Sequence, residues 1–258
     1  MQGSEGDAEL LFDAVREAGA LALTMFRQNV RRWSKGDGSP VSEADVMVDA
    51  LLRNRLLEHR PGYGWLSEET VDNDDRLHCE NVWIADPIDG TRAFINGNSD
   101  WCIAVALVSA GRPAAAAIYQ PVQEEFYTAI LGGGARVSGE IIVATDSPTL
   151  AKAHVAGTRK SLASLHAHGI VADVSGALPL QLRLAFVAAG RIDAAVSFGN
   201  KNDWDLAAGD LIVHEAHGVA GDLSGAKFIY NRSEPWQHGM IAAGAQRHAA
   251  ITRALRSP

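Results

Sequence analysis

The stretch WIADPIDGT, residues 83–91, decides how this chain folds and where its chemistry lies. An apolar run typical of a buried strand brings Asp86 to its end, and Asp89 follows in the same segment. Gly90 and Thr91 then interrupt the pattern, and the residues after them can begin a helix. Such a junction places carboxylates beside backbone N–H groups that lack intrahelical partners. A phosphate held by a metal ion needs both kinds of group, so this stretch is the first candidate for a functional site.

The composition of the 258-residue chain is ordinary for a folded protein, with 47% hydrophobic and 21% charged residues. A formal net charge of -8, with no basic cluster, argues against a nucleic-acid partner. Two cysteines, Cys79 and Cys102, form no disulfide framework, and free thiols are favoured over a single bridge. The chain shows no basic-then-apolar leader and no long apolar run. These features predict a soluble, cytoplasmic protein without a membrane partner.

The first half of the chain is predicted to combine helices with a sheet. Apolar residues recur at helical spacing between residues 10 and 26, and a Ser42-x-x-Asp45 pattern predicts a capped second helix that ends before residues 61–62. A short strand is expected over residues 63–66. Apolar runs bounded by turn residues then predict further strands of a largely antiparallel sheet at 101–108, 114–119 and 126–131.

From about residue 140 short strands alternate with helices, which is typical of an α/β arrangement. The expected strands are 141–143, 154–156, 194–196 and 240–243, and the expected helices are about 159–167, 179–189, 205–217 and the C-terminal segment. No linker clearly separates two units. We therefore expect one catalytic domain over residues 1–258, with an α+β half at about 1–139 and an α/β half at about 140–258.

Several acidic residues stand at the boundaries of expected elements, and most of them have a structural explanation. Asp45 can complete a capping box at the start of the second helix. Asp89 and Asp205 can cap the helices that follow them. Glu68 and Glu69 can be solvated loop charges. Taken singly, each of these residues is explained without a functional role.

Asp86 is harder to explain in this way, because it ends an apolar run and precedes Pro87. A buried carboxylate without a partner is unfavourable, so a cation or strong donor is expected beside it. With Asp89 and the carbonyl of Ile88, one short segment can offer three oxygen ligands. Hard divalent cations such as Mg²⁺ prefer such ligands and usually also bind water and a substrate phosphate.

At this point the chain resembles a known family. The run DPIDGT at residues 86–91 resembles the first signature of the inositol monophosphatase family of Mg²⁺-dependent phosphatases. WDLAAGD at 204–210 resembles its second signature, and SPVSEAD at 39–45 and LSEE at 66–69 match its other metal-site segments in the expected order. The resemblance covers nearly the whole chain. It implies a layered αβαβα sandwich of the inositol monophosphatase and fructose-1,6-bisphosphatase type, commonly a homodimer.

The resemblance also implies roles for particular residues. The implied metal ligands are Glu68, Asp86, the carbonyl of Ile88, Asp89 and Asp205. Asp45 would help to hold a further, weaker ion, so two or three Mg²⁺ ions are expected. Glu68 and Thr91 would orient the attacking water, with Asp86 as the third catalytic residue, and Gly90 and Thr91 would bind phosphate through backbone N–H groups. Glu69 can share the work of Glu68.

The chain departs from the family pattern where the substrate would lie. Members that favour inositol phosphates resemble one another in a Glu shortly before the Trp-Asp pair, where this chain has Ser197-Phe198-Gly199, and residues 200–203 are one residue longer. A small Gly/Ser pair is replaced by Leu178-Pro179. We therefore consider Ser197, Arg183 and Lys201 as substrate-binding candidates. The two cations can meet a second phosphate, or they can be exposed surface charges.

Together these features predict an enzyme that hydrolyses a small phosphate monoester with Mg²⁺, by in-line attack of water. Inositol monophosphate is the default substrate by resemblance. The alternatives are a 3′(2′),5′-bisphosphate nucleotide, histidinol phosphate or a sugar phosphate. A rival of another class is a regulatory protein of the same fold that binds RNA or protein.

Overall fold

Two long helices, α1 (Gln2–Met25) and α2 (Glu43–His59), form one outer layer of the protein. The computed structural model describes residues 2–36, 38–173 and 178–256. A short antiparallel hairpin, β1 (Arg32–Ser34) with β2 (Pro40–Ser42), joins the two helices. The predicted capping interaction is present at the start of α2, where the backbone N–H of Ser42 donates to Asp45 Oδ2 at 2.8 Å. Asp45, which is expected at the functional site, therefore also caps the start of a helix.

The second layer is a sheet of seven strands in the order β3-β4-β5-β6-β7-β8-β9. The strands are β3 (Gly64–Ser67), β4 (Asn81–Asp89), β5 (Cys102–Ser109), β6 (Arg112–Gln120), β7 (Glu125–Ile130), β8 (Gly134–Val137) and β9 (Glu140–Ile141). β3 runs parallel to β4 and every other pair is antiparallel, as the sequence predicts. β4 and β5 are buried along most of their length, because helices cover both faces of this sheet.

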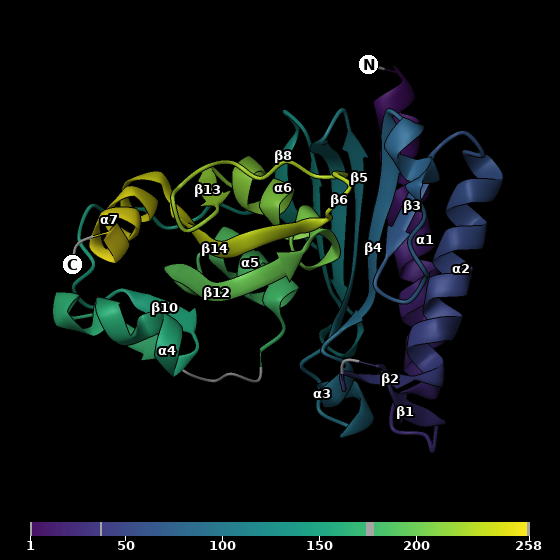
Figure 1. The fold of residues 1–258 in the computed structure, drawn as a ribbon, viewed down its shortest axis with the longest axis horizontal. Coiled ribbons are helices and arrows are strands. Elements are labelled where there is room, and N and C mark those ends of the chain that lie inside the picture. Colours follow the sequence, from purple (N-terminus) through teal and green to yellow (C-terminus); the bar gives the residue numbers. More distant parts are fainter. Residues whose placement is uncertain (1, 37, 174–177, 257–258) are drawn as a thin grey trace.

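The remaining layers come from the second half of the chain (Figure 1). Helices α5 (Leu180–Ala188) and α6 (Ala207–Glu215) lie between the first sheet and a second one. The second sheet has the order β11-β10-β12-β14-β13, with strands β10 (His154–Gly157), β11 (Val171–Asp173), β12 (Ala194–Asn202), β13 (Gly218–Gly221) and β14 (Trp236–Gly244). Helices α4 (Arg159–Leu162) and α7 (Ala245–Arg256) form the far layer.

Three clusters of buried apolar side chains correspond to these layers. One joins α1 and α2 to the first sheet, and one fills the space between the two sheets around α5 and α6. The third joins the far face of the second sheet to α7 and the segment after α4. The middle cluster contains side chains from both halves of the chain. The layered αβαβα arrangement expected from the resemblance is therefore confirmed.

Some element boundaries differ from the sequence-based expectation. The strand expected at 141–143 is confined to Glu140–Ile141, and it extends the first sheet by pairing with β8. The helix expected at 159–167 is divided into α4 and a 3₁₀ segment, Ala163–His168. The helix expected at 205–217 is α6, preceded by a 3₁₀ turn, Asp203–Asp205. Short i→i+3 turns have no distinct hydrophobic period, so the apolar pattern alone did not reveal them.

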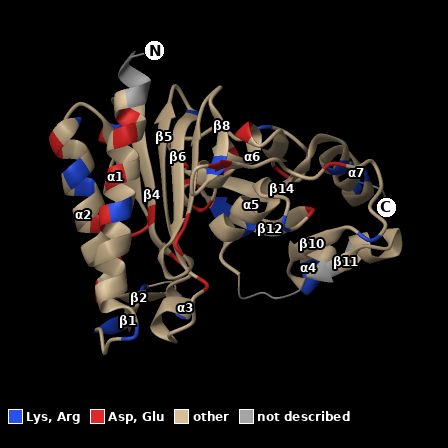
Figure 2. Ribbon diagram, turned by 180° about the vertical axis from the view of Figure 1, so that it is seen from behind, with Lys and Arg blue, Asp and Glu red and all other residues tan. Residues whose placement is uncertain are grey.

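Figure 2 shows mixed charges along α1 and α2, and acidic residues where the first sheet faces the second half of the molecule. Within the described part of the chain, no helix has the length and apolarity needed to cross a membrane.

The packing of α5 against α6 depends on the absence of a side chain at Gly209. A Cβ built there would lie 2.4 Å from Leu184 Cδ1 and 2.5 Å from Leu184 Cβ. We expect Gly209→Ala to lower the free energy of unfolding by roughly 1–3 kcal/mol, because overpacking outweighs the gain in helix propensity. Urea unfolding followed by circular dichroism measures this change. Gly62→Ala is the matched control, since a Cβ there meets nothing within 4 Å, and equal midpoints for both variants would contradict the packing argument.

Candidate active site

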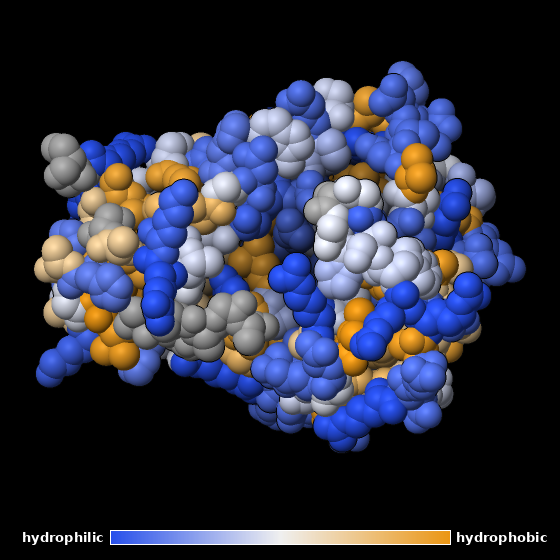
Figure 3. All heavy atoms as spheres, turned by 60° about the horizontal axis from the view of Figure 1, so that its bottom comes forward, coloured by the Kyte–Doolittle hydropathy of each residue, from blue (hydrophilic) through white to orange (hydrophobic). Residues whose placement is uncertain are grey.

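A cavity of about 600 Å³ opens at the end of β4, between the hairpin β1–β2 on one side and the start of α5 on the other. Figure 3 shows the molecule from this side, with hydrophilic residues around a hollow near the centre of the face. The predicted site residues that line the cavity are Glu68, Asp86, Ile88, Asp89, Gly90, Thr91, Arg183 and Asp205. They come from segments far apart in the sequence, so the fold brings the two signature motifs together.

The end of β4 lines this cavity at a point where its pairing with β5 is interrupted. The register between β4 and β5 shifts between Asp86 and Asp89. Gly90 follows with φ 102°, and α3 (Thr91–Ile95) begins directly after it. A Cβ at Gly90 would lie 2.7 Å from Pro179 Cγ and 2.8 Å from the carbonyl oxygen of Asp100. Only glycine fits this position, because both the positive φ and the close approach exclude a side chain.

Thr91 links the strand end to the second helix. Its hydroxyl lies 2.9 Å from Asp45 Oδ1 and 3.1 Å from the carbonyl oxygen of Ile88, and it can donate to either. The other Asp45 oxygen accepts hydrogen bonds from the backbone N–H and the hydroxyl of Ser42. Asp45 does not line the cavity, but it holds a residue that does. Its capping role and a role near the site are therefore compatible.

Glu68 and Glu69 are paired with a lysine that the sequence argument did not identify. Lys35 Nζ, in the loop between β1 and β2, lies 2.9 Å from Glu68 Oε1 and 2.7 Å from Glu69 Oε1. Glu69 is the more buried acid, with 5% of its side chain exposed against 26% for Glu68. Glu68 lines the cavity and Glu69 does not appear among the lining residues. Glu68 is therefore the better placed of the two to meet a substrate.

Asp89 caps a helix, but not the one that follows it in the sequence. Its Oδ2 accepts a hydrogen bond of 2.7 Å from the backbone N–H of Gln181, in the first turn of α5. The side chain of Gln181 is fully buried and donates to the carbonyl of Trp204, and it accepts from the N–H of Gly209. One glutamine thus connects the Asp89 segment to the turn that carries Asp205.

Asp205 is held by a second set of buried polar contacts. Its Oδ2 accepts from the backbone N–H of Asn202 at 2.7 Å, within the same 3₁₀ turn. Asp203, fully buried in that turn, accepts from the N–H of Asn231 and from Gln237 Nε2, both at 2.9 Å. The amide oxygen of Asn231 accepts in turn from Arg76, which is 1% exposed. Arg76 lies between β3 and β4, so this chain of contacts ties Asp205 to the strands that carry the other acids.

Burial makes the carboxylates at the strand end difficult to ionise together. Burial, and next the charge of Glu68, raises the pKa of Asp86 well above its usual range. Burial also raises the pKa of Asp89, although the Gln181 hydrogen bond and the charge of Arg183 oppose the shift. Asp205 has a pKa raised to about 6, again mainly by burial. A bound cation would offset the repulsion between the carboxylates and stabilise their ionised forms.

The donor set fits a hard divalent cation. Every candidate ligand is a carboxylate or carbonyl oxygen, the kind of donor that Mg²⁺ prefers. Asp86 is 1% exposed and its Oδ1 accepts no hydrogen bond, which leaves a buried oxygen that needs a positive partner. As the side chains stand, no three His, Cys, Asp or Glu side chains in the described ranges form a ready cluster for a metal ion. Glu68, for example, is held by Lys35.

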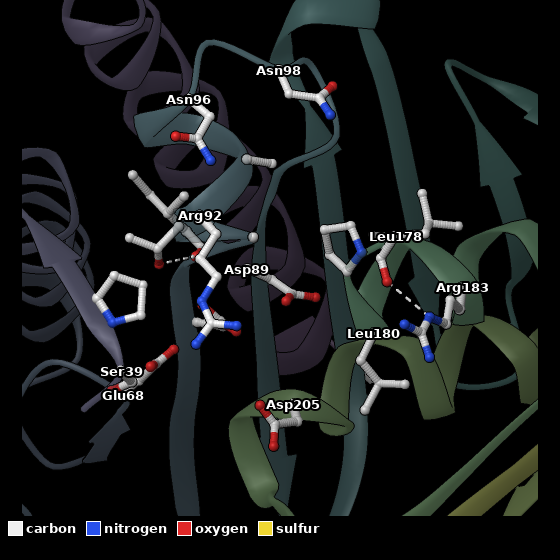
Figure 4. Close-up of a pocket in the computed structure, with 17 residues that line it drawn as sticks. Ser39, Glu68, Asp89, Arg92, Asn96, Asn98, Leu178, Leu180, Arg183 and Asp205 are labelled. Atoms are coloured by element: carbon white, nitrogen blue, oxygen red, sulfur yellow. Dashed lines mark hydrogen bonds between the residues drawn. The ribbon is translucent and has the colours of Figure 1, made fainter. Parts of the chain in front are cut away.

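The rest of the cavity wall separates into polar and apolar parts. Arg92, Asn96 and Asn98 come from α3 and the loop after it, and the sequence argument did not identify them (Figure 4). Arg92 directly follows the Gly90-Thr91 turn, so its position next to the motif could have identified it from the sequence as a residue of the cavity. Leu178 and Leu180 lie across Asp89 from Arg92 in Figure 4, and Pro179 also lines the cavity.

Two of the proposed substrate residues lie outside the cavity lining. Lys201 Nζ donates to the carbonyls of Phe198 and Asn200, so its ammonium group is directed to its own loop. Ser197 is 7% exposed and lies in β12, just before a shift in the pairing with β14. Of the three candidates, only Arg183 lines the cavity.

The fold, this cavity and the similarity to known proteins identify a phosphoric monoester hydrolase of a family that is known to be metal-dependent. The chain belongs to the Inositol monophosphatase family, whose model matches residues 6–257. The Inositol-1-monophosphatase of Mesorhizobium japonicum is 34% identical, over 90% of this chain and 88% of that protein. The Nus factor SuhB of Escherichia coli is 29% identical, over 82% of this chain and 83% of that protein.

A solved structure shows the same fold. The extragenic suppressor protein suhB from Bartonella henselae has a TM-score of 0.83 and 28% sequence identity, and covers 96% of this chain and 98% of its own. An enzyme of this family binds a small phosphorylated substrate.

The raised pKa values predict how pH affects cation binding. A carboxyl group must lose its proton to bind a metal ion, so we expect the affinity for Mg²⁺ to be full only above about pH 7, the pKa of Asp89, and to fall further as the pH drops through about 6, the pKa of Asp205. Between about pH 7.5 and 5.5 Asp205 alone predicts at least a fourfold loss of affinity. Calorimetric titration of Mg²⁺ at both pH values tests this, and unchanged affinity would contradict it.

The stability of the metal-free protein is expected to fall as the pH rises, whereas the affinity for Mg²⁺ is expected to increase. A carboxyl whose pKa is raised by folding binds protons more tightly in the folded state, so its contribution to stability is lost as the pH rises through the folded pKa. The melting temperature without Mg²⁺ should therefore fall as the pH rises through about 6.

The contacts of Asp203 predict a positioning effect. In Asp203→Asn the side chain keeps one acceptor oxygen, and its NH₂ group then faces a donor, either the N–H of Asn231 or Gln237 Nε2. We expect a loss of roughly 1–3 kcal/mol in unfolding free energy and weaker Mg²⁺ binding, because the turn that carries Asp205 shifts. Urea unfolding and calorimetry measure the two effects. The exposed Asp74→Asn should change neither, and a wild-type Mg²⁺ affinity in Asp203→Asn would rule out the positioning role.

Proposed function

We propose that this protein is a Mg²⁺-dependent phosphatase that hydrolyses a small phosphate monoester, with inositol monophosphate as the default substrate. The observation that carries the proposal is the meeting of Glu68, Asp86, Asp89 and Asp205 in one cavity with the Gly90-Thr91 turn. Two or three Mg²⁺ ions would be held by these carboxylates and the Ile88 carbonyl, with Asp45 near the weaker ion.

The residues of the turn suit the binding of the scissile phosphate. The N–H groups at the start of α3 have no intrahelical acceptor, and Gly90 leaves room for a ligand to approach the backbone. When bound, Mg²⁺ would stabilise negative charge on the phosphoryl group and lower the pKa of a coordinated water. The protein then has to hold water and phosphate in line, and it needs no covalent nucleophile.

Thr91 and Glu68 suit the orientation of the attacking water. The Thr91 hydroxyl donates its proton to Asp45 or to the Ile88 carbonyl, so its lone pairs can accept a hydrogen bond from water. Glu68 is partly exposed at the cavity, and its carboxylate can accept a hydrogen bond from the other O–H of that water. Lys35 must then release the Glu68 carboxylate, or share it, while the water is in place.

Both halves of the chain contribute to the cavity and to the central core, which supports a single catalytic domain over residues 1–258. A homodimer and a cytoplasmic location remain predictions from the resemblance and the sequence. A regulatory role is the second candidate, since some relatives are named Nus factor SuhB. The net charge of -8 favours the enzyme over a protein that binds RNA.

The central test is Asp86→Asn, assayed for phosphate release from a panel of esters with Mg²⁺ and with a chelator. We expect wild-type activity only with Mg²⁺, and a loss of at least about a hundredfold in the variant, because a buried ligand loses its charge. The circular dichroism spectrum should be unchanged, and the exposed Asp74→Asn is the matched control. Full activity in Asp86→Asn would refute the site, and no phosphate release from any ester would favour the regulatory candidate.

A further inference from the structure

Two cationic side chains are among the described residues that line the cavity, and they differ in accessibility. Arg183 is 9% exposed, and its Nε donates to the carbonyl oxygen of Leu178. Arg92 is exposed and directly follows the Gly90-Thr91 turn. Arg92 is therefore the cation that a ligand in the cavity can contact more easily.

The side chain of Arg92 is directed toward the acids of the site. Figure 4 shows it extending from α3 into the space between Glu68 and Asp89, which line the same cavity. Within the described ranges, however, the Arg92 side chain has neither a hydrogen bond nor an ion pair. A guanidinium group that lies beside acids without pairing with them keeps its N–H groups available for another anion.

Lys35 shows the contrasting arrangement. Its ammonium group lies 2.9 Å from Glu68 Oε1 and 2.7 Å from Glu69 Oε1, so two acids already hold it. A substrate that bound Lys35 would compete with both of these contacts. Arg92 can bind a substrate without the loss of any contact that the structure describes.

The charges of the cavity indicate which anion Arg92 would bind. When the carboxylates hold Mg²⁺, their charge is compensated by the metal, and the phosphate of the substrate remains as the anion that needs a donor. A guanidinium group binds phosphate through two parallel hydrogen bonds. Because Arg92 adjoins the turn that suits the scissile phosphate, this contact falls on the scissile phosphate and not on the alcohol.

We propose that Arg92 is a catalytic residue whose guanidinium group binds the non-bridging oxygens of the scissile phosphate. The proposal rests on the proposed phosphatase function and adds a residue to the same site. Water attacks phosphorus and forms the new P–O bond, the ester P–O bond breaks, and the alcohol leaves as ROH with one proton from the water. Arg92 transfers no proton. It stabilises negative charge on the phosphoryl oxygens during the displacement and on inorganic phosphate afterwards.

Mg²⁺ and phosphate should respond to Arg92 in opposite ways. Without phosphate, the positive charge of Arg92 beside the acids opposes the binding of a cation, whereas the same charge favours the binding of phosphate. Removal of a residue that only supports the fold of the site would weaken the binding of both ligands. The sign of the change in Mg²⁺ affinity therefore distinguishes a direct phosphate contact from a structural role.

Calorimetric titrations of the intact protein measure both affinities. With saturating Mg²⁺, Arg92→Gln should raise the Kd of inorganic phosphate by at least about tenfold, the scale of one hydrogen bond to a charged group. Without phosphate, the same variant should lower the Kd of Mg²⁺ by roughly twofold or more. Arg92→Lys should have an intermediate affinity for phosphate, because the charge remains but the two-pronged contact is lost. Arg136→Gln, at an exposed position of β8, is the matched control and should change neither affinity.

Kinetic measurements extend the test to the reaction. Arg92→Gln should lower kcat/KM by a similar factor, at least about tenfold, for esters of different alcohols, because the scissile phosphate is common to all of them. Inositol 1-phosphate and p-nitrophenyl phosphate are a suitable pair. A loss confined to one of these esters would overturn the proposal, since Arg92 would then contact the alcohol.

Two calorimetric results would also overturn the proposal. One is a Kd of phosphate in Arg92→Gln that stays within about twofold of the wild-type value. The other is a parallel loss of affinity for phosphate and for Mg²⁺, which would show a structural role. If the intact protein hydrolyses no ester, the phosphatase proposal fails, and the phosphate titration still decides whether Arg92 binds phosphate.

Discussion

The removal of water from carboxylates at the end of β4 is the constraint on which the rest of this structure depends. Asp86 is 1% exposed and carries a buried oxygen without a hydrogen-bond partner. Its pKa is raised by burial and then by the charge of Glu68. Such a cluster is unfavourable by itself, and the surrounding fold must hold it in place until a cation compensates its charge.

The neighbouring elements provide this support through hydrogen bonds that cross the layers. Asp89 accepts from the first turn of α5, and Gln181 connects that turn to the segment that carries Asp205. Arg76 and Asp203 join the same segment to the first sheet. The central helices are thus both a packing layer between two sheets and the frame that sets the spacing of the acids. The lack of a side chain at Gly209 lets these helices approach closely enough to do both.

The basic residues around the acids are distributed unevenly, so the two sides of the cavity differ in charge and polarity. Lys35 and Arg92 lie on the side of Glu68, and Arg183 lies beyond Asp89 against an apolar wall. The acids of the cavity come from the ends of β3 and β4 and from the turn before α6, whereas Leu180 and Arg183 belong to α5.

The motifs at residues 83–91 and 204–210 were sufficient to predict the class of fold, the reaction type and nearly all the acids that line the cavity. This was possible because ligand type, strand-end position and turn residues are local properties of the chain. The long helices and most strands were also predictable, since their apolar periods are regular. The tertiary structure alone decided that Asp89 caps α5, across 92 residues, and that Arg76 contacts Asn231, across 155 residues. It also directed Lys201 away from the cavity and Arg183 into its wall. Contacts between distant segments depend on how layers pack, and no local pattern of residues records that packing.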